Sequence, residues 1–480
     1  MRSAAETRSQ RFLLLLLLVT LAAKALYLAL LWPAHPGVLW SPDSGTYVRP
    51  ALALLKTGTF SQSPAPGSPP EINRTPGYPA LIAGVYALAG ERPVALAAAN
   101  IVLSTASIVL VAILAGSLFG PEAALSAALL LSLEPGSFRY STIILTEAPF
   151  VLVMLVFLAA AARFAESRRP AWAMAMGSAL GASVLVRPIL HYFVPIAAVV
   201  LFVGLRRAGA TRKRAGAVSI AFLLPASFFV GGWMLRNARV AGRPIVSTVE
   251  ELNLYLYRAA SVEAEASGES LEKTQERFGW REFLYRFGYV EREGDVFGDR
   301  RYVDLHPETA RLPTSELARD WGRKGREVLR AHPILALKQA VTGLVWLLFS
   351  PCALNWAYAL GAIPASSPVV GAAISWEEKR VFTLLFRDHP AVFALSVLSF
   401  LTLVVLYSLA ALGLARSRSG GRGLAHALLA ATALYLVAVS SAPGSVDDRF
   451  RLPLMPIVCL YAGAGLVARR GVHHPLRNSP

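Results

Sequence analysis

The sequence predicts an all-α polytopic membrane protein: a bundle of about 10 to 12 transmembrane helices with a small α-rich subdomain outside the membrane. Of its 480 residues, 55% are hydrophobic and only 16% are charged, and the mean hydropathy is +0.50. Soluble domains carry roughly a quarter charged residues, so this composition excludes an ordinary soluble protein. The apolar residues form separate runs of roughly 15 to 25, which fit membrane-spanning helices and not the short alternating strands of a β-barrel.

Ten apolar runs are candidate spans. The first, Phe12 to Trp32, follows three arginines and resembles a signal peptide, but its length of about 20 residues favours a retained span. The others are 92–117, 121–136, 143–162, 172–187, 188–205, 218–235, 391–415, 424–441 and 452–468. The stretch 331–374 is ambiguous, because its apolar part is followed by Pro351 and a Gly/Pro/Ser-rich segment. It should contribute either no span or two, because a single span would place the basic stretches 416–422 and 469–480 outside.

The net charge of +17 is concentrated in short loops and tails. Five stretches hold 17 lysines and arginines against two acids: 1–11, 163–169, 206–214, 416–422 and 469–480. The polar segment 238–330 is nearly neutral, with 16 basic and 17 acidic residues. The positive-inside rule places the five stretches and both termini in the cytoplasm, and 238–330 outside a bacterial inner membrane. The basic excess therefore reflects topology, and we expect no nucleic-acid partner.

The chain divides into three parts. These are an N-terminal transmembrane half, 1–237, with a first outer loop at 33–78; an outer subdomain, 238–330; and a C-terminal transmembrane region, 331–480, with no soluble domain expected before or after the bundle. The outer subdomain should contain a helix near 315–330, with Leu317, Trp321 and Val328 toward one side. It either caps the substrate cavity or forms only a solvated lid.

Metal and cofactor chemistry receive little support from the residues. Cys352 and Cys459 lie beside apolar runs and share no metal-ligand spacing, which predicts neither a disulfide framework nor a zinc site. The acids form no evident metal site, and no nucleotide-binding loop is present. We expect no metal ligands and no cofactor, and a divalent metal stays open as the alternative.

Two carboxylates are the candidate catalytic residues. Asp43 lies in the first outer loop, where partial burial would raise its pKa and suit it to act as a general base; the alternative is that it caps a helix beginning near Gly45. Glu147 lies at an apolar run, where a carboxylate costs a few kcal/mol unless it faces a polar cavity or a partner. Its alternative role is to compensate a helix dipole.

Several arginines lie where spans meet the predicted outer face. Each alone is compatible with an anchor that snorkels to the interface, but together they suit an anionic group such as a lipid phosphate. The candidates are Arg74, Arg187, Arg236, Arg449 and Arg451. The candidate pocket residues are Tyr47, Tyr78, His191 and Asn237, although a lone histidine is more often structural. Lys24, in the first span, either snorkels, reaches a polar cavity or pairs with an acid such as Glu147.

Several stretches, taken in order, carry a family resemblance across nearly the whole chain. They read PDSGTYVRPALALLKTG with RTPGYPALIAG, then EPGSFRYSTIILTEAPF, VRPILHYFVP, WMLRNARVAGRPIVST and DDRFRLPLMPIVCLYAGAG. The sequence thus resembles the GT-C membrane glycosyltransferases that use polyprenyl-phosphate sugars. Within them it is similar to the dolichyl-phosphate-mannose protein mannosyltransferases and the bacterial aminoarabinose transferases, a glycosyltransferase family 39-like group.

The resemblance implies that Asp43 occupies the first-loop catalytic position and Glu147 a second acidic position. It also implies that Arg74, Arg187 and Arg236 surround the donor phosphate. Two features depart from the protein mannosyltransferases: Asp43 is followed by Ser44 and not by a second acid, and no soluble domain is inserted. The wider family therefore fits better than the protein-mannosyltransferase label.

The chemistry of this family suits the residues. A sugar that leaves on a phosphate needs little proton donation but benefits from cations beside that phosphate, which the arginines supply. The acceptor hydroxyl needs a base on the opposite face of the sugar, the role expected of Asp43, and a single displacement inverts the anomeric centre. The expected partners are a polyprenyl-phosphate sugar, membrane lipids, and a lipid, protein or envelope-glycan acceptor.

Two other classes of protein remain open from the sequence. A transporter or lipid flippase should gather polar groups near the bilayer midplane, where only Lys24 lies. A structural or assembly protein without catalysis should tolerate the loss of Asp43. Sugar transfer that depends on Asp43 would separate both from a glycosyltransferase.

Overall fold

The computed structural model describes residues 4–289, 312–364, 366–369, 378–417, 423–441 and 448–468. Parts of the predicted outer subdomain, 290–311, and most of two predicted basic stretches, 418–422 and 469–480, lie outside the described residues. The described chain is built from helices, and its one β feature is an isolated bridge between Ser61 and Pro70. The predicted all-α class is confirmed.

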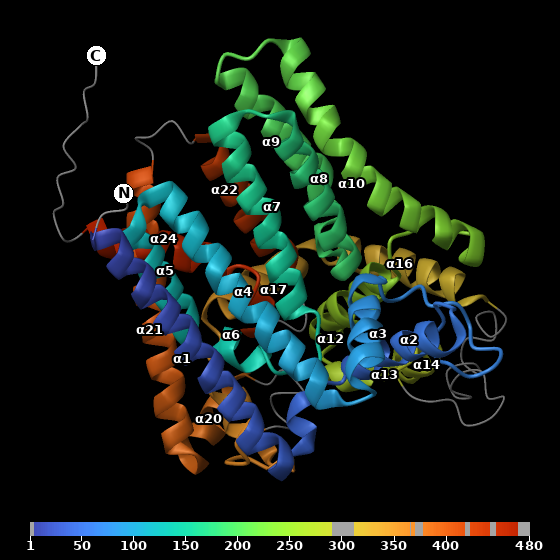
Figure 1. The fold of residues 1–480 in the computed structure, drawn as a ribbon. Helices are drawn as coiled ribbons and strands as arrows, with labels where there is room; N and C mark the ends of the chain where they lie inside the picture. The colour runs from blue at the N-terminus through green and yellow to red at the C-terminus, as the bar shows by residue number, and fades with distance from the viewer. Residues whose placement is uncertain are drawn as a thin grey trace.

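Each of the ten predicted spans contains a helix, and the helices pack into the bundle seen in Figure 1. Six of them are long and apolar enough to cross a membrane: α1 (Ala4–Ala34), α4 (Pro93–Phe119), α7 (Glu147–Ser167), α10 (Arg212–Ala241), α21 (Pro390–Arg416) and α22 (Gly423–Ser440). The remaining four are shorter: α5 (Pro121–Leu133), α8 (Pro170–Val186), α9 (Phe193–Arg207) and α24 (Met455–Ala468). The chain is thus a multi-pass membrane protein.

The ambiguous stretch after residue 330 contains one long apolar helix. This helix, α17 (Pro333–Phe349), meets the polar helix α16 (Thr314–Ala331) at an angle of 100°. Pro333 explains the bend, because proline suits the first position of a helix but cannot continue the preceding one. The pair counts as at most one bent span. Two separate spans in 331–374 therefore find no support in the described part, where only the short α18 (Ala353–Ala359) follows.

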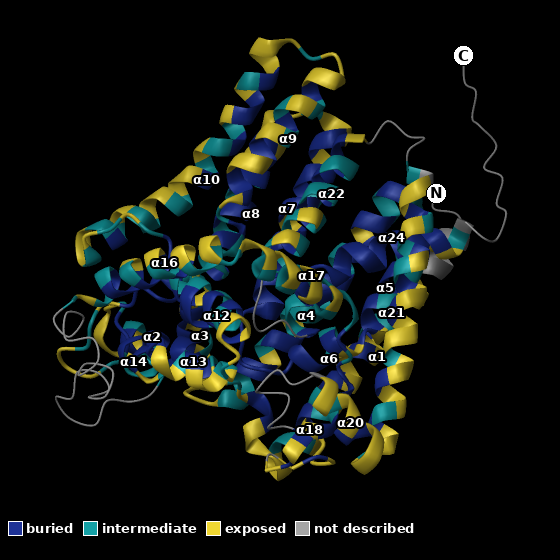
Figure 2. Ribbon diagram, turned by 180° about the vertical axis from the view of Figure 1, so that it is seen from behind, coloured by how far each residue is buried: buried dark blue, intermediate teal, exposed yellow. Residues whose placement is uncertain are grey.

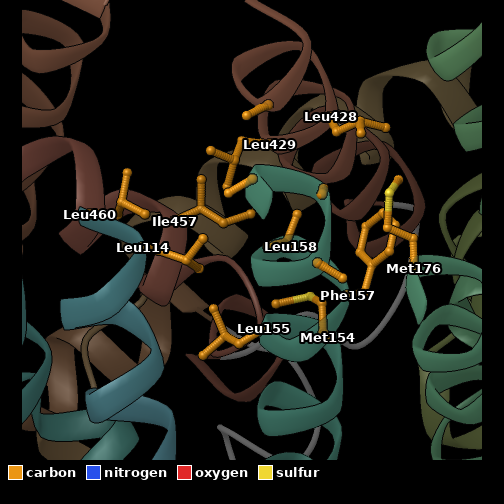
Figure 3. Close-up of a cluster of buried hydrophobic side chains, with 14 of the residues drawn as sticks. Leu114, Met154, Leu155, Phe157, Leu158, Met176, Leu428, Leu429, Ile457 and Leu460 are labelled. Carbon is orange, nitrogen blue, oxygen red and sulfur yellow. The ribbon is translucent and has the colours of Figure 1, made fainter. Parts of the chain in front are cut away.

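The bundle is held together around α7. Figure 3 shows Met154, Leu155, Phe157 and Leu158 of this helix among apolar side chains of α4, α8, α22 and α24. All four α7 side chains are buried. This helix therefore packs against four neighbours as a central span does, although Val156 on another side remains exposed.

Two helix pairs approach closely because glycine leaves no side chain between them. A Cβ on Gly177 of α8 would lie 1.9 Å from the Phe222 carbonyl oxygen of α10, and one on Gly465 of α24 would lie 2.1 Å from the Leu409 carbonyl oxygen of α21. Small residues at such crossings are characteristic of membrane helices, whose association depends on close packing. Other apolar side chains face away from the bundle: Leu14, Leu18 and Leu30 of α1 are exposed. Figure 2 shows exposed stretches in yellow along α10.

A polar subdomain lies at one end of the bundle, beside α2 (Ser44–Thr57) and α3 (Gly77–Ala89) (Figure 1). Its described helices are α11 (Val249–Leu252), the π-helix η3 (Asn253–Ala259), α12 (Ala260–Ser267), α13 (Leu271–Arg277), α14 (Trp280–Arg286) and α16. Its core includes Tyr255, Phe287 and Trp321. Leu317 and Trp321 of α16 are fully buried and Val328 packs against the same core, as their spacing predicts.

Candidate functional site

The two predicted acids occupy the beginnings of helices. Asp43 precedes α2, but its side chain makes no capping hydrogen bond, so its carboxylate is available for other partners. Glu147 is the first residue of α7 and is buried. Three arginines meet these acids from separate parts of the chain: Arg74 before α3, Arg187 after α8, and Arg449 in α23 (Asp448–Arg451).

These five residues form one alternating chain of charges. Arg74 Nη2 lies 2.8 Å from Asp43 Oδ1, and Arg449 Nη1 lies 2.8 Å from Asp43 Oδ2. Glu147 Oε1 accepts from both Arg449 Nε, at 2.5 Å, and Arg187 Nη1, at 3.0 Å. The structure thus brings together three of the five predicted phosphate-binding arginines with both predicted acids. We call these five residues the charge cluster.

Arg74 is the most extensively bonded member of the charge cluster. Its Nε donates to Thr46 Oγ1 at 2.8 Å, its Nη1 to the Tyr47 hydroxyl at 3.1 Å, and its Nη2 to the Tyr289 hydroxyl at 2.7 Å. The guanidinium also stacks 4.5 Å from the centre of the Tyr47 ring. Planar, multiply bonded guanidinium groups are well suited to hold a phosphate in one orientation.

The electrostatics of the first loop are strongly perturbed. Burial raises the pKa of Asp43, but the charges of Arg74 and Arg449 outweigh burial and hold that pKa well below its ordinary value. Glu71 behaves in the opposite way: burial raises its pKa to about 7, against the hydrogen bonds that it accepts from the backbone N–H groups of Arg74 and Asn73. Those bonds, at 2.7 and 2.6 Å, fix the backbone that carries Arg74.

Two of the predicted phosphate-binding arginines lie outside the charge cluster. Arg236 donates to the carbonyl oxygens of Glu71 and Phe60, at 2.5 and 2.7 Å, and therefore anchors the first loop to α10. Arg451 is almost fully buried and donates to the Leu347, Leu348 and Ser350 carbonyl oxygens at the end of α17. Both guanidinium groups are engaged by backbone. Their predicted contact with the donor phosphate remains an untested prediction.

The predicted pocket residues also divide. Tyr47 belongs to the site through Arg74, and Tyr78 packs edge-on against Tyr47 with ring centres 5.4 Å apart. His191 instead stacks on Tyr192, and its Nε2 lies 3.7 Å from Glu250. Asn237 is buried and donates to the Ile245 carbonyl oxygen at 2.8 Å, a structural contact.

The polar subdomain supplies site residues that the sequence did not indicate. The Tyr289 hydroxyl lies 3.2 Å from Asp43 Oδ1 in addition to its bond with Arg74. Burial, and to a smaller extent the charge of Asp43, raises the pKa of Tyr257 in η3. π-Helical turns often occur at functional sites. No local pattern around either tyrosine distinguishes it from the other tyrosines of the subdomain.

The two carboxylates are already balanced by arginines, which leaves little capacity for a bound cation. Within the described ranges, no group of three or more His, Cys, Asp or Glu side chains is arranged to hold a metal ion. The charge cluster instead has three guanidinium groups for two carboxylates and therefore one positive charge in excess. Such a cluster suits an anionic ligand.

The helical bundle and the charge cluster together describe an all-α polytopic membrane protein with an ionic site where helix ends meet. Over residues 73–230, the sequence matches the family model described as dolichyl-phosphate-mannose-protein mannosyltransferase. The predicted resemblance is thus confirmed, and the matched residues include Arg74, Glu147 and Arg187, whereas Asp43 and Arg449 lie outside them. No curated protein matches the sequence.

An archaeal transferase of known structure has a similar fold. The apo oligosaccharyltransferase of Archaeoglobus fulgidus is 15% identical with a TM-score of 0.50, and the match covers 94% of this chain and 50% of that chain. AglB of the same organism, in complex with an inhibitory peptide and a dolichol-phosphate, is 13% identical with a TM-score of 0.49, over 94% and 50% of the two chains. ArnT from Cupriavidus metallidurans, bound to undecaprenyl phosphate, is 14% identical with a TM-score of 0.37, over 93% and 77%. The chain spans about half the length of the archaeal enzyme.

Proposed function

We propose that the protein is an integral membrane glycosyltransferase that moves a sugar from a polyprenyl-phosphate donor to an acceptor hydroxyl. The description of the family model matching residues 73–230 names both glycosyl transfer and a lipid-phosphate donor, which supports this assignment. The basic loops 163–169 and 206–214 lie at the opposite helix ends from Glu147. By the positive-inside rule, the charge cluster then faces the outside of a bacterial inner membrane, and both termini are cytoplasmic.

The charge cluster is the observation that carries the proposal. Its three guanidinium groups converge on two carboxylates at the end of the bundle, and the positive excess is available to a phosphate. Side chains of Asp43, Arg187 and Arg449 keep 24, 14 and 15% of their surface exposed, so a ligand can reach them. A phosphate held by these guanidinium groups would bring its sugar close to Asp43.

The reaction that fits this arrangement is a single displacement. The acceptor oxygen forms a bond to the anomeric carbon while the bond from that carbon to the phosphate oxygen breaks, and the electron pair leaves with the phosphate. The acceptor proton passes to Asp43 as general base. The arginines stabilise the negative charge that develops on the leaving phosphate, and the anomeric centre is inverted.

The low pKa of Asp43 in the charge cluster gives donor binding a second effect. A carboxylate paired with two arginines is a weak base, because its charged form is already stabilised. A donor phosphate competes for the same guanidinium groups of Arg74 and Arg449 and so weakens their hold on Asp43. The pKa of Asp43 then rises, and the base becomes effective once the donor is bound.

The acceptor should enter between the charge cluster and the polar subdomain. Tyr289 of that subdomain contacts both Arg74 and Asp43 and presents an aromatic ring and a hydroxyl group to the site. Such groups suit a sugar or another hydroxylated acceptor. Lipid, protein and envelope-glycan acceptors all satisfy this chemistry.

A transfer assay tests the function. The purified protein in proteoliposomes is given radiolabelled undecaprenyl-phosphate mannose, then other undecaprenyl-phosphate sugars, with bacterial envelope extract as the acceptor source. We expect radiolabel to move from the donor lipid to an acceptor with wild-type protein and not with Asp43→Asn. Asp388→Asn serves as the matched control, because among the described residues Asp388 pairs only with its exposed neighbour Arg387 on α20 (Glu378–Asp388).

The outcomes separate the competing classes. Full transfer by Asp43→Asn would remove Asp43 as the base. No transfer by wild type from any donor, accompanied by movement of the intact donor lipid between leaflets, would instead favour a flippase.

A further inference from the structure

A second polar feature lies behind the charge cluster, inside the bundle. A cavity between α1, α4, α6 (Pro135–Tyr140) and α7 is lined by Lys24, Ser107, Ser137, Ser141 and Glu147. Charged and hydroxyl side chains are costly in the interior of a membrane protein unless they are hydrogen-bonded or functional. Glu147 belongs both to this cavity and to the charge cluster, so it separates the two.

The carboxylate of Glu147 is satisfied on one side only. Its Oε1 accepts from Arg187 and Arg449, whereas Oε2 is buried and has no hydrogen-bond partner among the described residues. The residue as a whole is only 2% exposed. A buried, unsatisfied carboxylate oxygen costs more than a neutral acceptor would, so a partner on the cavity side is expected.

Lys24 brings an equally buried positive charge to the same cavity. Its side chain is 2% exposed, and its Nζ donates to Ser104 Oγ at 2.7 Å, the one hydrogen bond that it makes within the described part of the chain. An ammonium group has three N–H donors, so two remain. Its other neighbours include the Phe138 ring, whose centre lies 5.8 Å away, and the acid Glu134. The Glu134 carboxylate already accepts from the backbone N–H groups of Gly136 and Ser137.

We propose that this cavity is a hydration site in which hydrogen-bonded water joins Lys24 Nζ to Glu147 Oε2. The serine hydroxyls of the lining supply the two to four polar partners that a buried water needs. Lys24 is then a positioning residue: it fixes Glu147, which in turn orients Arg187 and Arg449 in the charge cluster. The catalytic consequence rests on the proposed function, whereas the link from Lys24 to Glu147 does not.

The link matters most when the donor binds. Arg449 is shared between Asp43 and Glu147, and a phosphate would draw it away from both. Lys24, through the water, leaves Glu147 with a positive partner on its far side. Arg187 and Glu147 can then keep their positions while Arg449 engages the phosphate.

The experiment measures the water-mediated link between Lys24 and Glu147 separately from its effect on the kinetics of transfer. Lys24→Met keeps a similar apolar length but removes the donors, and Thr20→Val is the matched control one turn away on α1, because the Thr20 hydroxyl bonds only to the Leu16 carbonyl oxygen of its own helix. Infrared difference spectroscopy, with Glu147→Gln to assign the signal, reports the carboxylate stretching frequency of Glu147. We expect Lys24→Met to shift this frequency and Thr20→Val to leave it unchanged. Lys24→Arg should return the carboxylate frequency of Glu147 most of the way to its wild-type value.

The kinetic measurement determines the KM values of donor and acceptor, with undecaprenyl-phosphate mannose or whichever undecaprenyl-phosphate sugar supports transfer as the donor. Lys24→Met should raise the donor KM about tenfold, with the acceptor KM unchanged, because it loosens only the phosphate-binding arginines. Should Lys24→Met fail to fold, Ser107→Val, which replaces a lining hydroxyl by methyl groups, is expected to give the same spectral shift. An unshifted frequency in folded Lys24→Met and Ser107→Val would overturn the proposal. Failure of wild-type transfer would refute the proposed function and leave the infrared result standing.

Discussion

Arg449 contacts both acids of the charge cluster: its Nη1 lies 2.8 Å from Asp43 Oδ2, and its Nε lies 2.5 Å from Glu147 Oε1. Asp43 and Glu147 begin helices that are about a hundred residues apart in the chain, and Arg449 comes from near the C-terminal end. One side chain therefore ties the first loop, the central helix α7 and the last part of the bundle into a single site.

Arg449→Lys should strongly impair sugar transfer. A lysine ammonium keeps the charge, but it cannot place two separate donors on Asp43 and Glu147 as the fork of a guanidinium does. We expect kcat/KM to fall about 100-fold, with most of the loss in donor KM. Steady-state kinetics check this, with Arg387→Lys on the exposed face of α20 as the control. Equal kinetics for the two variants would contradict the bridging role.

Tyr289→Phe tests whether the polar subdomain takes part in the site. The variant keeps the ring but loses the hydroxyl that contacts both Arg74 and Asp43, at 2.7 and 3.2 Å. We expect transfer to slow about tenfold while the melting temperature changes little. Tyr285→Phe, on α14 in the same subdomain, should have no effect on transfer. A Tyr289→Phe enzyme as active as wild type would reduce the subdomain to a lid.

The pH dependence of stability should contain a contribution from Glu71. Its pKa is about 7 in the folded protein against 4.5 for the ordinary side chain, so the folded state binds the proton more tightly than the unfolded state. The corresponding stability is therefore complete below about pH 4.5 and is lost as the pH rises through 7. The contribution of Glu71 to the free energy of unfolding is at most about 3 kcal/mol.

Glu71→Gln removes this titration but keeps an oxygen that accepts from the N–H groups of Asn73 and Arg74. Between pH 5 and pH 8, the melting temperature of wild-type protein in detergent should fall more steeply than that of the variant. Parallel curves would show that Glu71 does not carry the effect.

The contact between α8 and α10 predicts opposite effects for two glycines. Gly177→Ala places a Cβ against the Phe222 carbonyl oxygen, whereas Gly216 of α10 has nothing within 4 Å of the added carbon. Gly177→Ala should destabilise by about 1 to 3 kcal/mol, because backbone must move. Gly216→Ala should stabilise by up to about 1 kcal/mol, because alanine favours the helix. Melting temperatures in one detergent compare the two, and the reverse order would refute the close packing.

Much of the site could be predicted from the sequence, because burying a charged side chain in a membrane protein costs free energy unless the charge is paired or functional. Asp43, Glu147, Arg74, Arg187 and Arg449 stand out as ionisable residues at the ends of apolar runs, where burial demands partners. The structure brings those five together. The same reasoning selected Arg236 and Arg451, because they too lie at the ends of apolar runs. In the structure their guanidinium groups donate to backbone carbonyl oxygens instead.

What the sequence could not indicate depends on tertiary contacts. Tyr289 reaches the site because the subdomain folds back over the first loop, where Gln62 donates to the Arg286 carbonyl oxygen. No hydrophobic periodicity in the sequence predicts that the subdomain folds over the first loop. The helices were predictable because apolar runs are long, whereas the shortness of α5, α9 and α24 depends on turns at their ends.

The most direct test of the central claim is the affinity of Asp43→Asn for undecaprenyl phosphate, measured together with single-turnover sugar transfer. Asp43 and the phosphate compete for Arg74 and Arg449, so removal of the carboxylate charge should free both arginines. The account predicts that the variant binds the lipid more tightly than wild type, while its transfer rate falls at least about 100-fold for want of a base. Weaker lipid binding, or transfer at the wild-type rate, would contradict it.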